Sequence, residues 1–172
     1  EDIEKLYDEI TGQLLPHDAV KRARQEEVDS LNKFPVYEKV PAANGYGNKK
    51  ISVIWADVNK GDSDNMQVRS RLVGREFKWH DPFMQGTFAA TPPLESLRYL
   101  LHWALTRTRR RGVTVSKKIL ALDVRRAHFR PPAVRELYID LPVEDATPCM
   151  IGRLLRTLYG TRDAANQWDA FA

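Results

Sequence analysis

The chain has 172 residues, 42% of them hydrophobic and 29% charged, which suits one or two compact domains with a core and excludes a disordered chain. A formal charge of +4 is compatible with a polyanionic partner but does not identify one. The single cysteine, Cys149, excludes an internal disulfide framework and favours a reducing compartment, cytoplasm or nucleus. No apolar run approaches the roughly 20 residues that cross a bilayer, and the acidic start is no signal peptide, so we expect an intracellular protein.

The first predicted element is an amphipathic helix. Residues 1–17 have few packing signals, and Asp18 is the expected N-cap of a helix that ends near Pro35. Its apolar side has helical spacing and comprises Val20, Ala23, Val28 and Leu31. Its charged residues are expected mainly on a solvated side: Lys21, Arg22, Arg24, Glu26 and Glu27.

Residues 50–58 and 67–77 are rich in strand-forming residues and predict an antiparallel hairpin with an eight-residue loop. Because side chains alternate along a strand, Arg69, Arg71 and Arg75 should project from one face. Guanidinium groups match phosphate oxygens, so this face is a candidate phosphate contact; the alternative is a solvated strand face. Three carboxylates lie in or near the loop, Asp57, Asp62 and Asp64. They do not form a calcium-binding loop, because the central glycine and the terminal glutamate of an EF-hand are missing.

Residues 78–90 are expected to be irregular, with Trp79, Phe83 and Phe88 as anchors to the core. A second helix is predicted from an N-cap at Thr91 to a C-cap at Gly112, with a core-facing leucine stripe. Its basic end would lie at the negative end of the helix dipole. Solvation explains that cluster, and nucleic-acid contact is the alternative.

The apolar run at 119–124 predicts a short strand buried inside a sheet, with Asp123 at its exit. A further strand is predicted at 137–141. The last predicted element is a helix from Asp163 to Ala172, with Trp168 on its inner side.

These segments together resemble the reverse transcriptase of copia-type long-terminal-repeat retrotransposons, from about residue 13 to the last residue. The helix with Ala23 to Leu31 is similar to the opening helix of that family, and Arg69-Ser-Arg-Leu-Val-Gly-Arg75 to its basic fingers strand. Leu122-Asp-Val-Arg-Arg-Ala-His-Phe129 resembles its first palm motif, of the type Leu-Asp-Val-Lys-Thr-Ala-Phe. Leu158-Tyr-Gly-Thr-Arg-Asp-Ala-Ala-Asn-Gln-Trp168 resembles the second, of the type Leu-Tyr-Gly-Leu-Lys-Gln-Ala-Pro, and Tyr138-Ile-Asp-Leu-Pro142 stands where the family has a short strand.

The resemblance implies an α+β fold, with a fingers β-hairpin and amphipathic helices followed by an incomplete palm, an antiparallel sheet with helices. The expected division is an N-terminal extension at 1–17, fingers at 18–93 and a partial palm at 94–172. The implied activity is RNA-directed DNA synthesis. The implied partners are an RNA or DNA template-primer, a deoxynucleoside triphosphate and the remainder of a polyprotein.

Residue roles follow from the same resemblance. Asp123 matches the catalytic, metal-binding aspartate, with the Val124 carbonyl as a secondary ligand to Mg²⁺. The nucleotide would be bound by Arg69 and Arg71 at the triphosphate, His128 under the sugar, and Tyr159 and Gly160 along the pocket. Nucleic acid would contact four further arginines, Arg75, Arg109, Arg110 and Arg111.

The sequence also departs from the family. Thr161, Asp163 and Ala165 stand where leucine, glutamine and proline are usual, so Asp163 would bring a negative charge near the path of the phosphates. No Tyr-x-Asp-Asp turn occurs, and one carboxylate cannot hold the two magnesium ions of polymerase chemistry. We therefore expect no polymerase activity from these 172 residues alone. The alternative is a repurposed, non-catalytic protein that binds nucleic acid or has a structural role.

Overall fold

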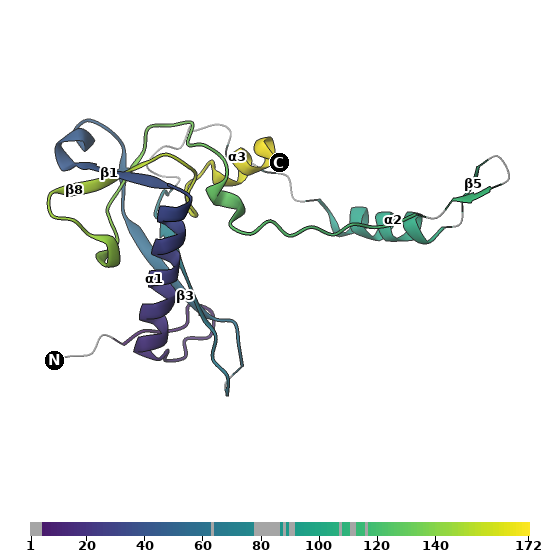
Figure 1. Cartoon of the computed structure of the whole chain (residues 1–172), viewed down its shortest axis with the longest axis horizontal. Coiled ribbons are helices and arrows are strands. Elements are labelled where there is room, and N and C mark those ends of the chain that lie inside the picture. Colours follow the sequence, from purple (N-terminus) through teal and green to yellow (C-terminus); the bar gives the residue numbers. More distant parts are fainter. Residues whose placement is uncertain are drawn as a thin grey trace. The chain divides into compact units, whose positions relative to one another are not determined.

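The computed structural model describes residues 5–62, 64–77, 87, 89, 92–106, 108–110, 113–115 and 117–172, and for the strands at 108–110 and 113–115 it describes the backbone alone. It divides the chain into two compact units (Figure 1). Unit 1 comprises residues 1–88 and 126–172, and unit 2 comprises residues 89–125. The expected division into extension, fingers and palm stays a prediction.

The described residues of unit 1 form two helices, three 3-10 turns and two sheets. In chain order its elements are α1 (His17–Lys33), β1 (Tyr37–Pro41), η1 (Ala42–Gly45), β2 (Lys50–Ile51), β3 (Val53–Asn59), β4 (Val68–Gly74), η3 (Ala127–Phe129), β7 (Tyr138–Ile139), η4 (Val143–Asp145), β8 (Met150–Leu154) and α3 (Ala164–Phe171).

Helix α1 lies along the hairpin of β3 and β4 (Figure 1). Its predicted apolar stripe, from Val20 to Leu31, is buried as expected. The helix begins at His17, after Pro16, so the prediction of Asp18 as N-cap is wrong by two positions. The placement of Glu27 on the solvated side is also wrong. Glu27 is fully buried, because it lies four residues from both Ala23 and Leu31 and so shares their face.

The predicted antiparallel hairpin is confirmed. Strand β3 pairs with β4 from Val53 opposite Gly74 to Asn59 opposite Val68, and residues 60–67 form the loop. Along β4, Ser70 is buried whereas Arg69 is exposed and Arg71 only half-buried, as the predicted alternation requires.

The predicted strand at 50–58 is divided at Ser52. Strand β2 joins the four-stranded sheet, of order β1-β8-β7-β2, while β3 joins β4 in the hairpin. Strand β2 pairs with β7 in parallel, and β8 pairs with both β1 and β7 in antiparallel fashion. The core of unit 1 lies between these elements and includes Leu31, Val36, Tyr37, Ile51, Leu72, Phe129, Leu137, Ile139, Leu154 and Leu158.

Unit 2 contains α2 (Leu94–Leu105) and the two-stranded antiparallel pair β5 (Thr108–Arg110) and β6 (Val113–Val115). The prediction that α2 continues to Gly112 is therefore wrong. The backbone of Thr106 is already extended, and residues 108–110 pair with residues 113–115 as two short strands instead of continuing the helix. The N-cap of α2 is Pro93, so the prediction of an N-cap at Thr91 is wrong by two positions. The predicted C-cap Gly112 lies outside the described residues, as do Arg111 and the predicted anchors Trp79, Phe83 and Phe88.

The predicted buried strand at 119–124 is wrong. This segment is neither helix nor strand, and Leu120 and Leu122 are each 80% exposed. A buried strand needs hydrogen-bonded neighbours and covered faces, and no described segment pairs with this run. The leucine stripe of α2 was likewise expected to face a core, but α2 has no buried residue. None of the helices that the structure describes is long and apolar enough to span a membrane.

Candidate functional site

The turn at Tyr159 and Gly160 is fixed against the end of β4. The N–H of Gly74 donates a hydrogen bond to the Tyr159 carbonyl, with an N···O distance of 2.7 Å. Gly160 has φ +80°, and a Cβ there would lie 2.2 Å from the Gly74 carbonyl oxygen. Both the backbone angle and the close approach therefore require glycine at position 160.

This turn places Tyr159 at the centre of a cluster from three distant segments. The guanidinium carbon of Arg71, on β4, lies 5.4 Å from the centre of the Tyr159 ring. The imidazole of His128, on η3, packs edge-on at 4.9 Å between ring centres. Phe129 packs on the same tyrosine at 5.3 Å and anchors the cluster in the core. We call Arg71, His128 and Tyr159 the tyrosine cluster.

The electrostatics of the tyrosine cluster favour a neutral histidine. Burial lowers the pKa of His128, a contact with the Ala164 backbone opposes this, and the positive charge of Arg71 lowers the pKa further. The lowered pKa favours the uncharged form of the imidazole at neutral pH. Its Nδ1 and the Nε of Arg71 are both buried without a hydrogen-bond partner in the described part of the chain. Buried polar atoms without a hydrogen-bond partner are uncommon in folded proteins. The tyrosine cluster holds two of them, so it has polar groups with which a ligand would form hydrogen bonds.

The remaining predicted residues lie in different surroundings. Arg69 is exposed on β4, two residues before Arg71, and Arg75 stacks on Phe77 with its guanidinium carbon 5.4 Å from that ring centre. Arg109 and Arg110 belong to β5 in unit 2. Of the five residues predicted to bind the nucleotide, the structure thus brings Arg71, His128 and Tyr159 together, and Gly160 makes the turn beside them.

The predicted magnesium ligands do not form a complete site. Asp123 and Val124 both belong to unit 2, in the irregular segment after β6. Across the ranges that the structure describes, no group of three or more His, Cys, Asp or Glu side chains is arranged to hold a metal ion. One carboxylate and one carbonyl are too few ligands for the two magnesium ions of nucleotidyl transfer, so the described residues do not fit this cofactor.

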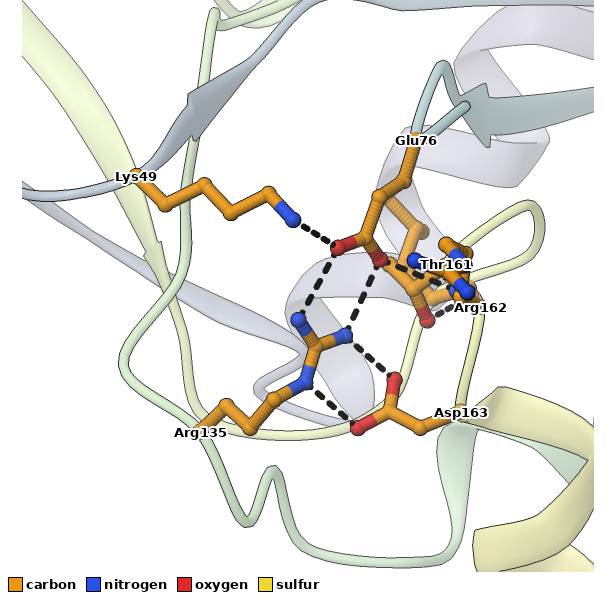
Figure 2. Close-up of polar contacts among 7 residues, drawn as sticks. Lys49, Glu76, Arg135, Thr161, Arg162 and Asp163 are labelled. Atoms are coloured by element: carbon orange, nitrogen blue, oxygen red, sulfur yellow. Dashed lines mark hydrogen bonds and ion pairs between the residues drawn. The ribbon is translucent and has the colours of Figure 1, made fainter. Parts of the chain in front are cut away.

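A buried ion-pair network lies next to the turn and was not predicted from the sequence. Figure 2 shows Lys49 and Arg135 directed at the Glu76 carboxylate, with Asp163 on the other side of the Arg135 guanidinium. Lys49 Nζ lies 2.6 Å from Glu76 Oε1, and Arg135 donates to both Glu76 oxygens at 2.9 Å. The backbone N–H of Arg162 donates to the same carboxylate at 2.9 Å. The network therefore joins the end of β4 to the start of α3.

Hydrogen bonding decides the charge state of this network. Burial by itself raises the pKa of Glu76, but the hydrogen bonds from Arg135, the Arg162 N–H and Lys49 outweigh it and lower the pKa to about 2. Asp163 accepts two hydrogen bonds from Arg135, at 2.8 and 2.7 Å. Its carboxylate is thus held in an ion pair with Arg135, and the expectation that Asp163 brings a negative charge near the path of the phosphates stays a prediction.

The chain is similar to the Pol polyprotein of a retroelement, which supports a retrotransposon-related origin. The relative is the Retrovirus-related Pol polyprotein from transposon TNT 1-94 of Nicotiana tabacum, 26% identical over 151 residues. The match covers 86% of this chain and 11% of the polyprotein, so the chain spans a small part of that relative. No protein-family model and no solved structure matches the chain.

Proposed function

We propose that this chain is the fingers and first palm segment of a copia-type reverse transcriptase and that unit 1 holds the nucleotide-binding half of its active site. The observation behind this proposal is the tyrosine cluster. Residues 71, 128 and 159 are far apart in sequence, the resemblance assigns each of them to the nucleotide, and they meet around one aromatic ring. The similarity to a retrotransposon Pol polyprotein supports the same origin.

The cluster offers suitable chemistry for a nucleotide. Arg71 supplies a guanidinium group for a phosphate, and exposed Arg69 extends the positive surface along β4. Tyr159 and neutral His128 offer flat surfaces for the sugar and base. Because imidazole is more polar than the phenyl ring usual at position 128, we expect weaker exclusion of a 2′-hydroxyl than in the family.

The binding half of the proposal is tested by equilibrium dialysis of labelled dTTP against the purified chain. We expect saturable binding that Arg71→Gln weakens by about tenfold, the usual scale of a lost charged contact. Arg75→Gln is the matched control, since Arg75 is an exposed arginine that packs on Phe77 outside the cluster. No saturable binding, or equal losses for the two variants, would contradict the nucleotide site.

The catalytic half of the proposal is a negative expectation. Asp123 is one carboxylate where two-metal chemistry needs more, so the chain alone, supplied with primer-template, magnesium and nucleotides, should not extend the primer. Templated incorporation that Asp123→Asn abolishes would show a complete active site and contradict the proposal.

A second candidate function is nucleic-acid binding without catalysis, and the charge of unit 2 favours it. Residues 89–125 contain eight lysines and arginines and two acidic residues, a formal charge of +6, whereas the whole chain carries +4. Tyr99 and Trp103 are 71% and 49% exposed and lie one helical turn apart on α2, so bases could stack on them. Lys117 lies above the Trp103 ring at 4.4 Å and adds a cation beside it.

This candidate predicts binding that depends steeply on salt. Release of counterions makes the logarithm of the binding constant fall linearly with the logarithm of salt concentration. Replacing Arg109 and Arg110 by glutamine should reduce that slope if unit 2 contacts the phosphates, whereas Arg69→Gln and Arg71→Gln should reduce it if β4 does. Absence of binding to single-stranded DNA or RNA at low salt would exclude this function.

A further inference from the structure

The outer edge of the segment from β2 to β3 is occupied at both ends and open in the middle. At its start, β2 pairs with β7, and the N–H of Asp140 donates to the Ile51 carbonyl at 3.1 Å. At its end, the N–H of Glu9 donates to the Asp57 carbonyl at 3.0 Å. The N–H of Asn59 donates to the Asp8 carboxylate at 2.6 Å. Segments from two different parts of the chain therefore already add to this edge.

Val53 and Trp55 lie between these two occupied stretches. Backbone groups in an antiparallel pair alternate between the partner strand and the outer edge. The Asp57 carbonyl and the Asn59 N–H both face outward. Val53 and Trp55 lie four and two residues before Asp57 on the same strand, so their main-chain N–H and C=O groups face outward as well. Strand β3 pairs only with β4 among the described strands, and no described segment hydrogen-bonds to the outer side of these two residues. Within the described part of the chain, the edge therefore has a gap with unused main-chain donors and acceptors.

A groove runs along this gap. On the side of η4, a hollow of about 320 Å³ is bounded by Val53, Trp55, Leu141 and neighbouring residues. On the side of α1, a hollow of about 630 Å³ is bounded by the same tryptophan together with Val20 and other residues of the helix. Both hollows are lined in part by Ile54, Trp55 and Val143, so they lie next to each other along the open edge.

The walls of the groove combine apolar surface with one unpaired cation. Ile54 is 41% exposed and Val143 is 90% exposed. Arg24 pairs with two carboxylates, that of Asp57 at 2.7 Å and that of Glu144 at 3.3 Å. Lys21 lies one helical turn before Arg24, and among the described residues it has no carboxylate partner. A ligand with a carboxylate beside β-branched side chains would match this pattern.

We propose that the gap at Val53 and Trp55 binds a short, extended, acidic peptide segment of a partner protein, which adds to the outer edge of β3 as a strand. Main-chain hydrogen bonds to the open edge would hold the peptide, apolar side chains would cover Ile54 and Val143, and a carboxylate would pair with Lys21. Main-chain groups of this edge already form hydrogen bonds next to the gap, to the Glu9 N–H and to the Asp8 carboxylate, which lie in and beside a turn. The inference is independent of the proposed nucleotide site, since no residue of the tyrosine cluster lines the groove.

The test uses a blocked pentapeptide, acetyl-Glu-Val-Glu-Val-Glu-amide, titrated into the full chain by calorimetry, with amide hydrogen exchange measured by NMR. We expect saturable binding and about tenfold slower exchange of the Trp55 N–H. A peptide of the same side chains with methylated backbone nitrogens is the matched control, and it should bind about tenfold more weakly because it cannot donate to the edge. Lys21→Glu should weaken the acidic peptide severalfold and favour acetyl-Lys-Val-Lys-Val-Lys-amide. Lys21 is exposed, so this variant should fold, as circular dichroism would verify.

Three results would overturn the proposal. The first is the absence of saturable binding at millimolar concentrations of the acidic peptide. The second is equal affinity for the acidic peptide and its methylated control, which would indicate that side chains alone bind the groove. The third is protection of Trp55 without peptide in a chain that light scattering shows to be dimeric, since a second copy would then occupy the edge.

Discussion

Replacing Glu76 by glutamine tests how the turn beside the tyrosine cluster is held. The Glu76 side chain is fully buried, and its pKa falls from an ordinary 4.5 to about 2 because the hydrogen bonds outweigh burial. This difference corresponds to about 3 kcal/mol of folding stability at neutral pH. The neutral amide of Glu76→Gln would leave Arg135 and Lys49 without their shared carboxylate, so we expect a loss of about 3 kcal/mol.

The pH dependence has a defined sign. A carboxyl group with a lowered native pKa stabilises the fold fully above its unfolded value and loses that stabilisation as the pH falls through its folded value. Equilibrium urea unfolding should therefore show the full difference between wild type and Glu76→Gln at pH 7 and a shrinking difference between pH 4.5 and about 2. Glu38→Gln is the matched control, because Glu38 pairs with Arg153 at the surface, where such pairs contribute about 0 to 1 kcal/mol. This reasoning would be refuted if Glu76→Gln lowered the free energy of unfolding no more than Glu38→Gln does, or if its effect were independent of pH.

Three further predictions concern the same unit. Gly160→Ala should destabilise the chain by more than about 2 kcal/mol in thermal unfolding, whereas Gly47→Ala, also at positive φ but with open space around its Cβ, should cost only about 1 kcal/mol. Arg126→Ala should cost about 3 kcal/mol, because Arg126 pairs with the buried carboxylate of Glu27. Replacing both Arg126 and Glu27 by leucine should recover part of that loss, and no recovery would contradict the explanation. His128→Phe should raise the preference for deoxy- over ribonucleotides in competition dialysis by about fivefold, and an unchanged ratio would exclude contact between this side chain and the sugar.

The features that the sequence predicted correctly depend on local patterns. The apolar side of α1 follows from its helical spacing, and the β3–β4 hairpin follows from two strand-forming runs and a polar loop. The alternation of Arg69 and Arg71 with buried Ser70 follows from strand geometry alone. The backbone geometry of a helix or strand fixes which side chains share a face. These faces can therefore be predicted without knowing which segments pack against them.

The features that the sequence did not predict depend on contacts between distant segments. Glu27 lies on the buried face of α1, and the cation that pairs with its carboxylate there, Arg126, is almost a hundred residues further along the chain. Glu76 and Asp163 share Arg135, and no spacing rule connects these three positions. The apolar run at 119–124 has the composition of a buried strand, but burial needs neighbours that the described part of the chain does not supply. Composition predicts which secondary structure and which degree of burial a segment favours. Contacts with distant segments decide whether the segment adopts them.

Photo-cross-linking locates a bound nucleotide and so tests the central claim most directly. The full chain is irradiated with an azido-substituted deoxynucleoside triphosphate, and the modified residues are identified by peptide mass spectrometry. The proposed site predicts adducts on Tyr159 or His128 that excess dTTP suppresses and that Arg71→Gln reduces. Adducts confined to residues outside the tyrosine cluster, or labelling unaffected by dTTP, would contradict the claim that unit 1 binds the nucleotide there.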